Sequence, residues 1–199
     1  MLKIALTGGI ATGKSHVLDL FRRRGVPCLD ADSLAHGVEA AGTEATQAIA
    51  ARFGSAVLGG DGAVDRAKLG PIVFADAAAR QELEAIVHPA VYRAITAGLR
   101  AFELTENPRL AVVDIPLLFE TGRASDFDTV IATVCPVAMQ VERLVARGMT
   151  DAEARQRLAA QLPAAEKAAR AQHTIDTSGT FADTETQVQR ILERLVAGR

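Results

Sequence analysis

The sequence predicts an α/β fold in which a parallel β-sheet lies between layers of helices. Four short apolar runs are typical of buried parallel strands: Lys3–Leu6, Val26–Leu29, Leu110–Val113 and Val130–Val134. Helical patterns separate these runs, so strands and helices alternate, as in a doubly wound sheet. A glycine-rich loop also joins the first run to a helical pattern, as in phosphate-binding α/β units. His173–Ile175 is a weaker candidate for a fifth strand.

The interval between the second and third runs, residues 33–108, contains no convincing strand. Its apolar residues recur at helical spacing and predict one long amphipathic helix: Leu83, Ile86, Val87, Val91, Ile95, Leu99 and Phe102. A turn is expected earlier in the interval, at Gly59, Gly60 and Gly62. We therefore expect a helical insertion at the edge of the sheet, forming a substrate-binding subdomain.

His88 and Pro89 lie inside this long helix. Proline cannot donate a hydrogen bond to the Ala85 carbonyl, so we expect a kink there that exposes polar backbone. His88 would lie at the bend and could bind substrate, although a packed or capping histidine would give the same pattern.

Residues 143–170 are rich in arginine and predict a helix–turn–helix. Thr150 and Glu153 fit a capping box, so a helix is expected to begin near Asp151. Pro163 should end that helix and can serve as the first residue of the next one. An arginine-rich helix–turn–helix of this kind is typical of a mobile lid.

Three arginines belong to this segment: Arg143, Arg147 and Arg157. The first two are four residues apart on one helix face. Such side chains can clamp a polyphosphate or stabilise charge on a transferred group, but an ordinary charged surface would look the same.

Composition excludes several classes of function. The chain has 199 residues and a formal net charge of −2, which provides no basic field for a nucleic acid. Aromatic residues make up 4%, with no Trp, so base-stacking surfaces are not expected. No apolar run approaches the roughly 20 residues of a membrane span. Two cysteines and an N-terminus without a signal pattern favour a cytoplasmic protein with free thiols.

The strongest motif is a complete phosphate-loop pattern between a predicted strand and a predicted helix. Its residues are Gly8, Gly9, Ile10, Ala11, Thr12, Gly13, Lys14 and Ser15. In such a loop, backbone N–H groups at a helix N-terminus hold phosphate oxygens. Lys14 would reach the β- and γ-phosphates of a nucleotide, and the Ser15 hydroxyl would bind Mg²⁺. The alternative is a glycine turn before a buried helix.

Three carboxylates follow predicted strands, where open α/β sheets bind ligands. Asp30 and Asp32 would lie on one side of the second strand if that strand continued so far. Asp32 is a candidate base for a hydroxyl acceptor, or else the N-cap of a helix beginning near Ser33. Asp114 fits the acidic residue that completes Mg²⁺ coordination, or a carboxylate that caps the next turn.

The order of these motifs resembles the dephospho-coenzyme A kinase family, over essentially the whole chain. The motifs are Leu6–Ile10 with Gly13–Ser15, Asp30–Asp32, His88–Pro89, Pro116–Glu120, Arg143 with Arg147, and Arg157–Gln161. The resemblance implies a P-loop NTPase fold similar to adenylate kinase, with three layers and a five-stranded parallel sheet. It also implies one kinase domain made of a nucleotide-binding core (1–32, 109–142 and 171–199), a helical coenzyme A-binding insertion (33–108) and a lid (143–170).

The reaction implied by the resemblance is ATP-dependent phosphorylation of the ribose 3′-hydroxyl of dephospho-coenzyme A. Asp32 would be the base, Lys14 and Arg143 would assist catalysis, and Mg²⁺ would be held by Ser15 and Asp114. ATP would contact the phosphate loop together with His16, Arg143, Arg147, Thr177 and Gly179. Dephospho-coenzyme A would contact Asp32, His88, Pro116, Leu117, Leu118, Phe119, Glu120 and Arg157.

Two positions depart from the family pattern. His16 replaces the usual Thr, and Thr177 stands where an Asn usually precedes the glycine near the adenine. No nucleic acid or membrane partner is expected, and the oligomeric state stays open. The rival functions are a kinase with another small acceptor, a GTP-binding switch and a non-catalytic nucleotide-binding module. The only Asn, Asn107, is followed by Pro108, which rules out the Asn-Lys-x-Asp motif that reads guanine.

Overall fold

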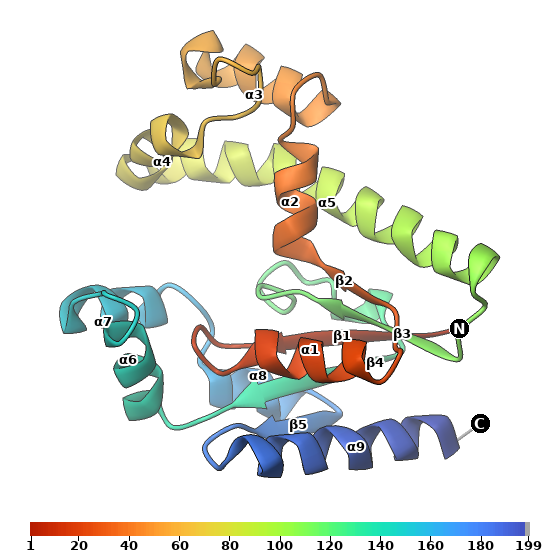
Figure 1. The fold of residues 1–199 in the computed structure, drawn as a ribbon. Helices are drawn as coiled ribbons and strands as arrows, with labels where there is room; N and C mark the ends of the chain where they lie inside the picture. The colour runs from red at the N-terminus through yellow and green to blue at the C-terminus, as the bar shows by residue number, and fades with distance from the viewer. Residues whose placement is uncertain (198–199) are drawn as a thin grey trace. The chain divides into compact units, whose positions relative to one another are not determined.

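The protein contains a five-stranded parallel sheet (Figure 1). The computed structural model describes residues 1–197. The strands are β1 (Leu2–Gly8), β2 (Cys28–Asp30), β3 (Leu110–Asp114), β4 (Thr129–Val134) and β5 (His173–Asp176), in the spatial order β2-β3-β1-β4-β5. The predicted fold class is therefore confirmed, including the weaker fifth strand.

Strand β2 is shorter than the apolar run that predicts it, because it begins at Cys28 rather than at Val26. Pro27 has no N–H group to donate to a neighbouring strand. Its carbonyl still accepts a hydrogen bond from the backbone N–H of Val112 (3.0 Å), a distance typical of such bonds in a sheet. The run therefore approaches β3 before regular pairing starts.

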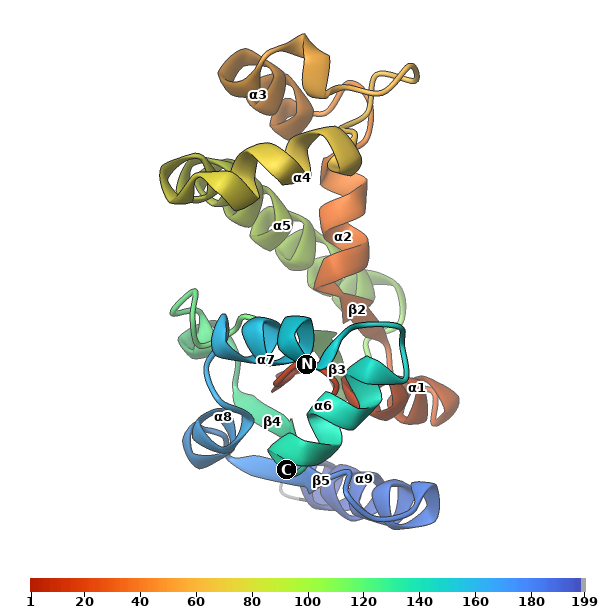
Figure 2. The same ribbon diagram turned by 90° about the vertical axis from the view of Figure 1, so that its left-hand side faces the viewer.

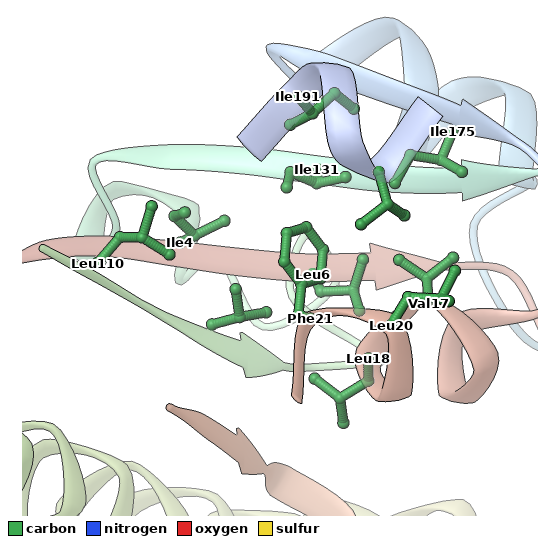
Figure 3. Packing of buried hydrophobic residues seen from close by; sticks show 12 residues of the cluster. Ile4, Leu6, Val17, Leu18, Leu20, Phe21, Leu110, Ile131, Ile175 and Ile191 are labelled. Atoms are coloured by element: carbon green, nitrogen blue, oxygen red, sulfur yellow. The ribbon is translucent and has the colours of Figure 1, made fainter. Parts of the chain in front are cut away.

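Helices cover both faces of the sheet. Helices α1 (Lys14–Arg23) and α9 (Phe181–Ala197) lie on one side, and α8 (Ala164–Arg170) lies on the other (Figure 2). Ile4 and Leu6 of β1 are fully buried on the side of α1 and α9, as the two-residue period of a strand requires. Figure 3 shows this cluster, which also contains Val17, Leu18, Leu20, Phe21, Leu110, Val112, Ile131, Ile175, Val188 and Ile191.

The chain divides into two compact units. The first comprises residues 1–29 and the described part of 101–199, and the second comprises residues 30–100. The second unit contains α2 (Ala31–Val38), α3 (Glu44–Phe53), a 3₁₀ turn (Ser55–Val57), α4 (Arg66–Ala75) and most of α5 (Ala77–Thr105). It has its own apolar core, formed by Ile49, Val57, Leu69, Val73 and Ala79.

The long helix expected in this interval is confirmed as α5, which is 29 residues long and includes Pro89. The glycine turn is confirmed as well, and an isolated antiparallel bridge between Leu58 and Val64 closes it. Pro89 does not end α5, because the helix continues on both sides of the proline.

The start of α2 corrects one expectation about Asp32. The helix begins at Ala31, and its N-cap is Asp30, whose Oδ1 accepts hydrogen bonds from the N–H groups of Asp32 (2.9 Å) and Ser33 (3.1 Å). The N-cap alternative for Asp32 is therefore wrong. Strand β2 also ends at Asp30, so the two carboxylates are not related by the two-residue period of a strand.

The segment after β4 contains α6 (Val137–Val145) and α7 (Asp151–Ala159). The predicted capping box is confirmed, since Thr150 and Glu153 each bind the backbone N–H of the other. Pro163 has ψ 141°, which is not helical, so it is the N-cap of α8 rather than its first residue. Helix α7 ends at Ala159, before the proline.

A short 3₁₀ helix, Ala124–Asp126, precedes β4. Within residues 1–197, no helix combines the length and the apolar character needed to cross a membrane.

Replacement of Phe21 tests the core. Phe21 is fully buried, so Phe21→Ala should lower the free energy of unfolding by about 3–5 kcal/mol through lost burial and a cavity. Phe74→Ala is the matched control, because Phe74 is 82% exposed and its replacement should change stability by about 0.5 kcal/mol or less. Urea denaturation measures both, and equal losses would contradict this description of the core.

Candidate active site

The phosphate loop connects the end of β1 to the start of α1, at the carboxyl edge of the sheet (Figure 1). Gly13 is the N-cap of α1 with φ +80°, a conformation that glycine adopts without strain. Ala11 also has a positive φ, 61°, which is uncommon for a residue with a side chain. The first N–H groups of α1 have no partner within the helix and are available to phosphate oxygens.

Two glycines of the loop are needed because protein atoms lie directly behind them. A Cβ on Gly8 would lie 2.1 Å from the Thr133 hydroxyl oxygen and 2.6 Å from that of Thr12. A Cβ on Gly9 would lie 2.8 Å from Nε2 of Gln140. The loop therefore lies flat against β4 and α6, and a side chain at either position would push it away.

Helix α6 donates hydrogen bonds to two successive carbonyls of the loop. Nε2 of Gln140 donates to the carbonyl of Ile10 (2.6 Å), and Nη1 of Arg143 donates to that of Ala11 (3.1 Å). Gln140 and Arg143 are three residues apart, so they share one helix face. These contacts hold the loop from the side of α6.

Threonine side chains hold the carbonyls on either side of that pair. The Thr12 hydroxyl donates to the Gly9 carbonyl (2.8 Å), and the Thr177 hydroxyl donates to the Thr12 carbonyl (2.9 Å). Thr12 also shares a 2.6 Å hydrogen bond with Thr133 of β4. Four consecutive carbonyls, of residues 9–12, thus accept hydrogen bonds from side chains.

Lys14 and Asp114 form an ion pair beside the loop. Nζ of Lys14 lies 2.8 Å from Oδ1 and 2.9 Å from Oδ2 of Asp114. The pairing of β1 with β3 explains this proximity, since Leu6 is in register with Asp114. Ser15, the next residue along α1, is exposed. The structure thus brings together the predicted phosphate-binding lysine and the predicted metal-binding carboxylate.

Arg143 has further contacts beyond the loop. Its Nη2 donates to the Thr177 carbonyl (2.7 Å), and its Nη1 donates to the Thr177 hydroxyl (3.2 Å) and to Sγ of Cys135 (3.5 Å). Thr177 therefore connects the loop after β5 to both Arg143 and the phosphate loop. The other two predicted arginines, Arg147 and Arg157, are exposed.

The Cys135 thiol lies in this same cluster, and both cysteines are free. Burial raises the pKa of Cys135, and the neighbouring Arg143 only partly offsets that effect. Burial likewise raises the pKa of Cys28 to about 12. Neither thiol is therefore activated as a nucleophile.

The predicted substrate segment, residues 116–120, is largely packed into the protein. Leu118 and Phe119 are buried, and Leu117 is half-buried. The guanidinium of Arg170 lies 4.3 Å from the centre of the Phe119 ring, a cation–π distance. Pro116 and Leu117 are thus the apolar residues of this segment that keep some surface to offer a ligand.

Two other predicted nucleotide residues lie near the N-terminus of α9. The His16 ring packs edge-on against Phe181, with 4.7 Å between ring centres. Its Nε2 is buried, and among the described residues it has no hydrogen-bond partner. Gly179 lies against Asp183, since a Cβ there would be 2.8 Å from Oδ2 of that carboxylate. Hydrogen bonds from Thr180 to Asp183 lower the pKa of that carboxylate.

Asp32 and His88 belong to the second unit, residues 30–100. Asp32 is exposed in the first turn of α2, and no hydrogen bond or ion pair of its carboxylate is found among residues 1–197. His88 is half-buried within α5. Their predicted catalytic and substrate-binding roles stay predictions.

Sequence reasoning missed three residues around the site: Thr133, Gln140 and Lys167. The position of Gln140, one helical turn before Arg143, is the one available signal. Thr133 and Lys167 lie within an apolar strand and an alanine-rich helix, and no motif singles them out.

The model of the family described as "Dephospho-CoA kinase" matches residues 2–183 of the chain. The chain belongs to the dephospho-CoA kinase family. It is therefore an enzyme, and the reaction of the family is ATP-dependent phosphorylation of dephospho-CoA, the final step of CoA biosynthesis. Family membership excludes a GTP-binding switch and a non-catalytic module.

Curated relatives named dephospho-CoA kinase are similar over their full length. The one from Anaeromyxobacter dehalogenans is 46% identical, with 100% of this chain and 94% of the relative covered. The one from Geobacillus kaustophilus is 44% identical, with 97% and 96% covered.

Two solved structures are also similar to this chain. The dephospho-CoA kinase from Campylobacter jejuni has a TM-score of 0.73 and 26% identity, with 98% of each chain covered. The shikimate kinase from Acinetobacter baumannii has a TM-score of 0.52 and 17% identity, with 100% of this chain and 95% of that chain covered. This second likeness concerns the fold alone.

The space behind Gly8 gives a testable prediction for the loop. Gly8→Ala should weaken ATP binding at least tenfold, because the added Cβ must displace the loop from Thr133. Gly37→Ala is the matched control, since no atom lies within 4 Å of a Cβ at that position of α2. Isothermal titration calorimetry with ATP measures both affinities, and an unchanged affinity for Gly8→Ala would refute the close packing.

Proposed function

We propose that the chain transfers the γ-phosphoryl group of ATP to the ribose 3′-hydroxyl of dephospho-CoA, with Asp32 as the general base. The observation that carries this proposal is the cap of α2. Asp30 binds the first N–H groups of the helix, which leaves the exposed carboxylate of Asp32 without a structural role there. A carboxylate held on a rigid helical turn, without a partner of its own, suits proton transfer.

In the proposed reaction, Asp32 orients the 3′-hydroxyl and accepts its proton. The hydroxyl oxygen then attacks the γ-phosphorus, the bond to the β–γ bridging oxygen breaks, and ADP leaves. A hydroxyl acceptor must lose a proton in this way, whereas a phosphate acceptor is already anionic. A positioned base contributes roughly 10²–10⁴ to the rate.

The phosphate loop and Lys14 hold the donor. The N–H groups of the loop bind phosphate oxygens, and the Lys14 ammonium offsets charge on the β- and γ-phosphates. Arg143 supports the loop through the Ala11 carbonyl. The exposed Arg147 is available to contact the ATP phosphates, and Thr177 and Gly179 border the adenine in this proposal.

The residues present fit a Mg²⁺ ion. Ser15 and Asp114 supply a hydroxyl and a carboxylate, which are the hard oxygen ligands that Mg²⁺ prefers. Mg²⁺ usually takes one or two protein ligands and completes its shell with water and substrate phosphates. Among residues 1–197 no cluster of three or more His, Cys, Asp or Glu side chains forms a metal cage, in keeping with that mode. When bound, the ion would neutralise phosphate charge.

On the acceptor side, we propose contacts from His88, Arg157 and the 116–120 segment. The insertion, residues 33–108, would hold coenzyme A, and residues 143–170 would close as a lid. ATP and dephospho-CoA are the partners in this proposal, and the cytoplasm, where free thiols persist, is its compartment.

Replacement of Asp32 tests the base directly. Asp32→Asn should lower kcat by roughly 10²–10⁴, because the amide cannot accept the proton at neutral pH. The dissociation constant of ATP should stay within twofold of the original value. Steady-state kinetics at saturating ATP and dephospho-CoA, with calorimetry for ATP, measure the two quantities.

Asp30→Asn is the matched control, because Asn caps helices as well as Asp does. It should leave kcat and stability nearly unchanged. A loss of less than tenfold for Asp32→Asn, or a larger loss for Asp30→Asn, would remove Asp32 from the role of base.

Replacement of Lys14 tests the donor side. Lys14→Ala should cost on the order of 3 kcal/mol of transition-state stabilisation, comparable to the loss of one preorganised donor. The measurement is kcat at saturating ATP, where weaker ground-state binding has no effect. An unchanged kcat would show that Lys14 contributes to ATP binding alone.

A further inference from the structure

Lys167 of α8 is a buried cation that no catalytic motif includes. Its side chain has 0% exposure, although lysine is almost never fully buried without a partner. Nζ of Lys167 donates to the carbonyl of Pro116 (2.7 Å) and forms an ion pair with Oε1 of Glu120, also at 2.7 Å. Both partners belong to the 116–120 segment, which begins two residues after Asp114.

Stability alone does not explain a buried ammonium at this position. Removing an ion pair from water carries a desolvation cost, and well-packed apolar residues of similar volume are often equally or more stabilising. The sequence of α8, Ala164–Arg170, is mostly alanine, and its other buried residue is Ala164. Helix α8 thus packs against the sheet through small residues and uses its one long buried side chain to reach residues 116 and 120.

The contacts of Lys167 hold both ends of the 116–120 segment. The Pro116 carbonyl also accepts from the Thr7 hydroxyl (3.3 Å), and Glu120 Oε1 also accepts from the backbone N–H of Leu162 (3.1 Å). The half-buried Leu117 lies between the two anchored residues.

Arg170, one helical turn after Lys167, covers the ring of Phe119. One face of α8 thus contacts the first, fourth and fifth residues of the segment.

Asp114, the proposed metal-binding carboxylate that precedes this segment, is held separately. The N–H of Ile115 donates to the Leu6 carbonyl (2.8 Å), and Asp114 is paired with Lys14. Loss of Lys167 should therefore loosen the segment after residue 115 and leave the contacts of Asp114 in place.

We propose that Lys167 is a positioning residue that holds residues 116–120 in the conformation that receives dephospho-CoA. The inference rests on the proposed contact between this segment and the acceptor. Lys167 contacts neither substrate and moves no proton. It acts through Pro116 and Glu120, so its loss should affect the KM of dephospho-CoA more than the KM of ATP.

Three variants separate positioning from folding: Lys167→Met, Glu120→Gln, and the two changes combined. Lys167→Met leaves the Glu120 charge without its partner and should lower the melting temperature. The double variant has neither charge, so much of that stability should return, because removing both partners is far less costly than removing one. The hydrogen bond from Lys167 to the Pro116 carbonyl is still missing in the double variant, where only the longer bond from Thr7 remains, and the KM of dephospho-CoA should stay raised.

The expected result, measured well below each melting temperature, is a KM for dephospho-CoA raised about tenfold in Lys167→Met and in the double variant. The KM of ATP should stay within twofold. Val188→Ala, in the core on the opposite face of the sheet, serves as a control for lost stability and should change neither KM. An unchanged KM for dephospho-CoA in Lys167→Met, or a proportional rise in both KM values, would overturn the inference.

Leu117→Ala separates two claims: that Lys167 positions residues 116–120, and that this segment contacts dephospho-CoA. If Leu117→Ala raises the KM of dephospho-CoA and Lys167→Met does not, the segment binds the acceptor and the role of Lys167 is wrong. If neither variant raises it, the assignment of the segment to the acceptor fails, and the inference fails with it.

Discussion

The site depends on the hydrogen bonds that hold the carbonyl oxygens of residues 9–12. A phosphate loop must present N–H groups to an anion, and carbonyl oxygens turned toward that anion would repel it. In this chain each of the four carbonyls accepts from a side chain, provided by Gln140, Arg143, Thr177 and Thr12 itself. The loop conformation, including the positive φ of Ala11, is therefore set by its surroundings before a nucleotide binds.

The sheet order makes these contacts possible. With β1 between β3 and β4, the loop after β1 is flanked by Asp114 at the end of β3 and by Thr133 near the end of β4. Thr177 follows β5, one strand farther along. A parallel sheet places the carboxyl ends of its strands at one edge, so residues 100 or more positions apart in the sequence meet around one loop.

Much of this arrangement follows from local sequence patterns. The four apolar runs and the weaker fifth candidate predict the strands, and the capping box at Thr150 correctly predicts the start of α7. Local patterns fail where neighbouring residues compete for one role, since Asp30 rather than Asp32 caps α2. They also fail for Gln140 and Lys167, whose partners are 130 and 51 residues away. Such contacts depend on how strands and helices pack, which residue spacing does not encode.

The choice of acceptor is the central claim, and a transfer assay tests it most directly. The protein with ATP and Mg²⁺ is offered dephospho-CoA, adenosine, AMP or shikimate, and the release of ADP and the phosphorylated product are measured. The account predicts rapid transfer to dephospho-CoA, with the new phosphate on the 3′-oxygen in the ³¹P spectrum, and little transfer to the other acceptors. Faster transfer to any of the other three would contradict it.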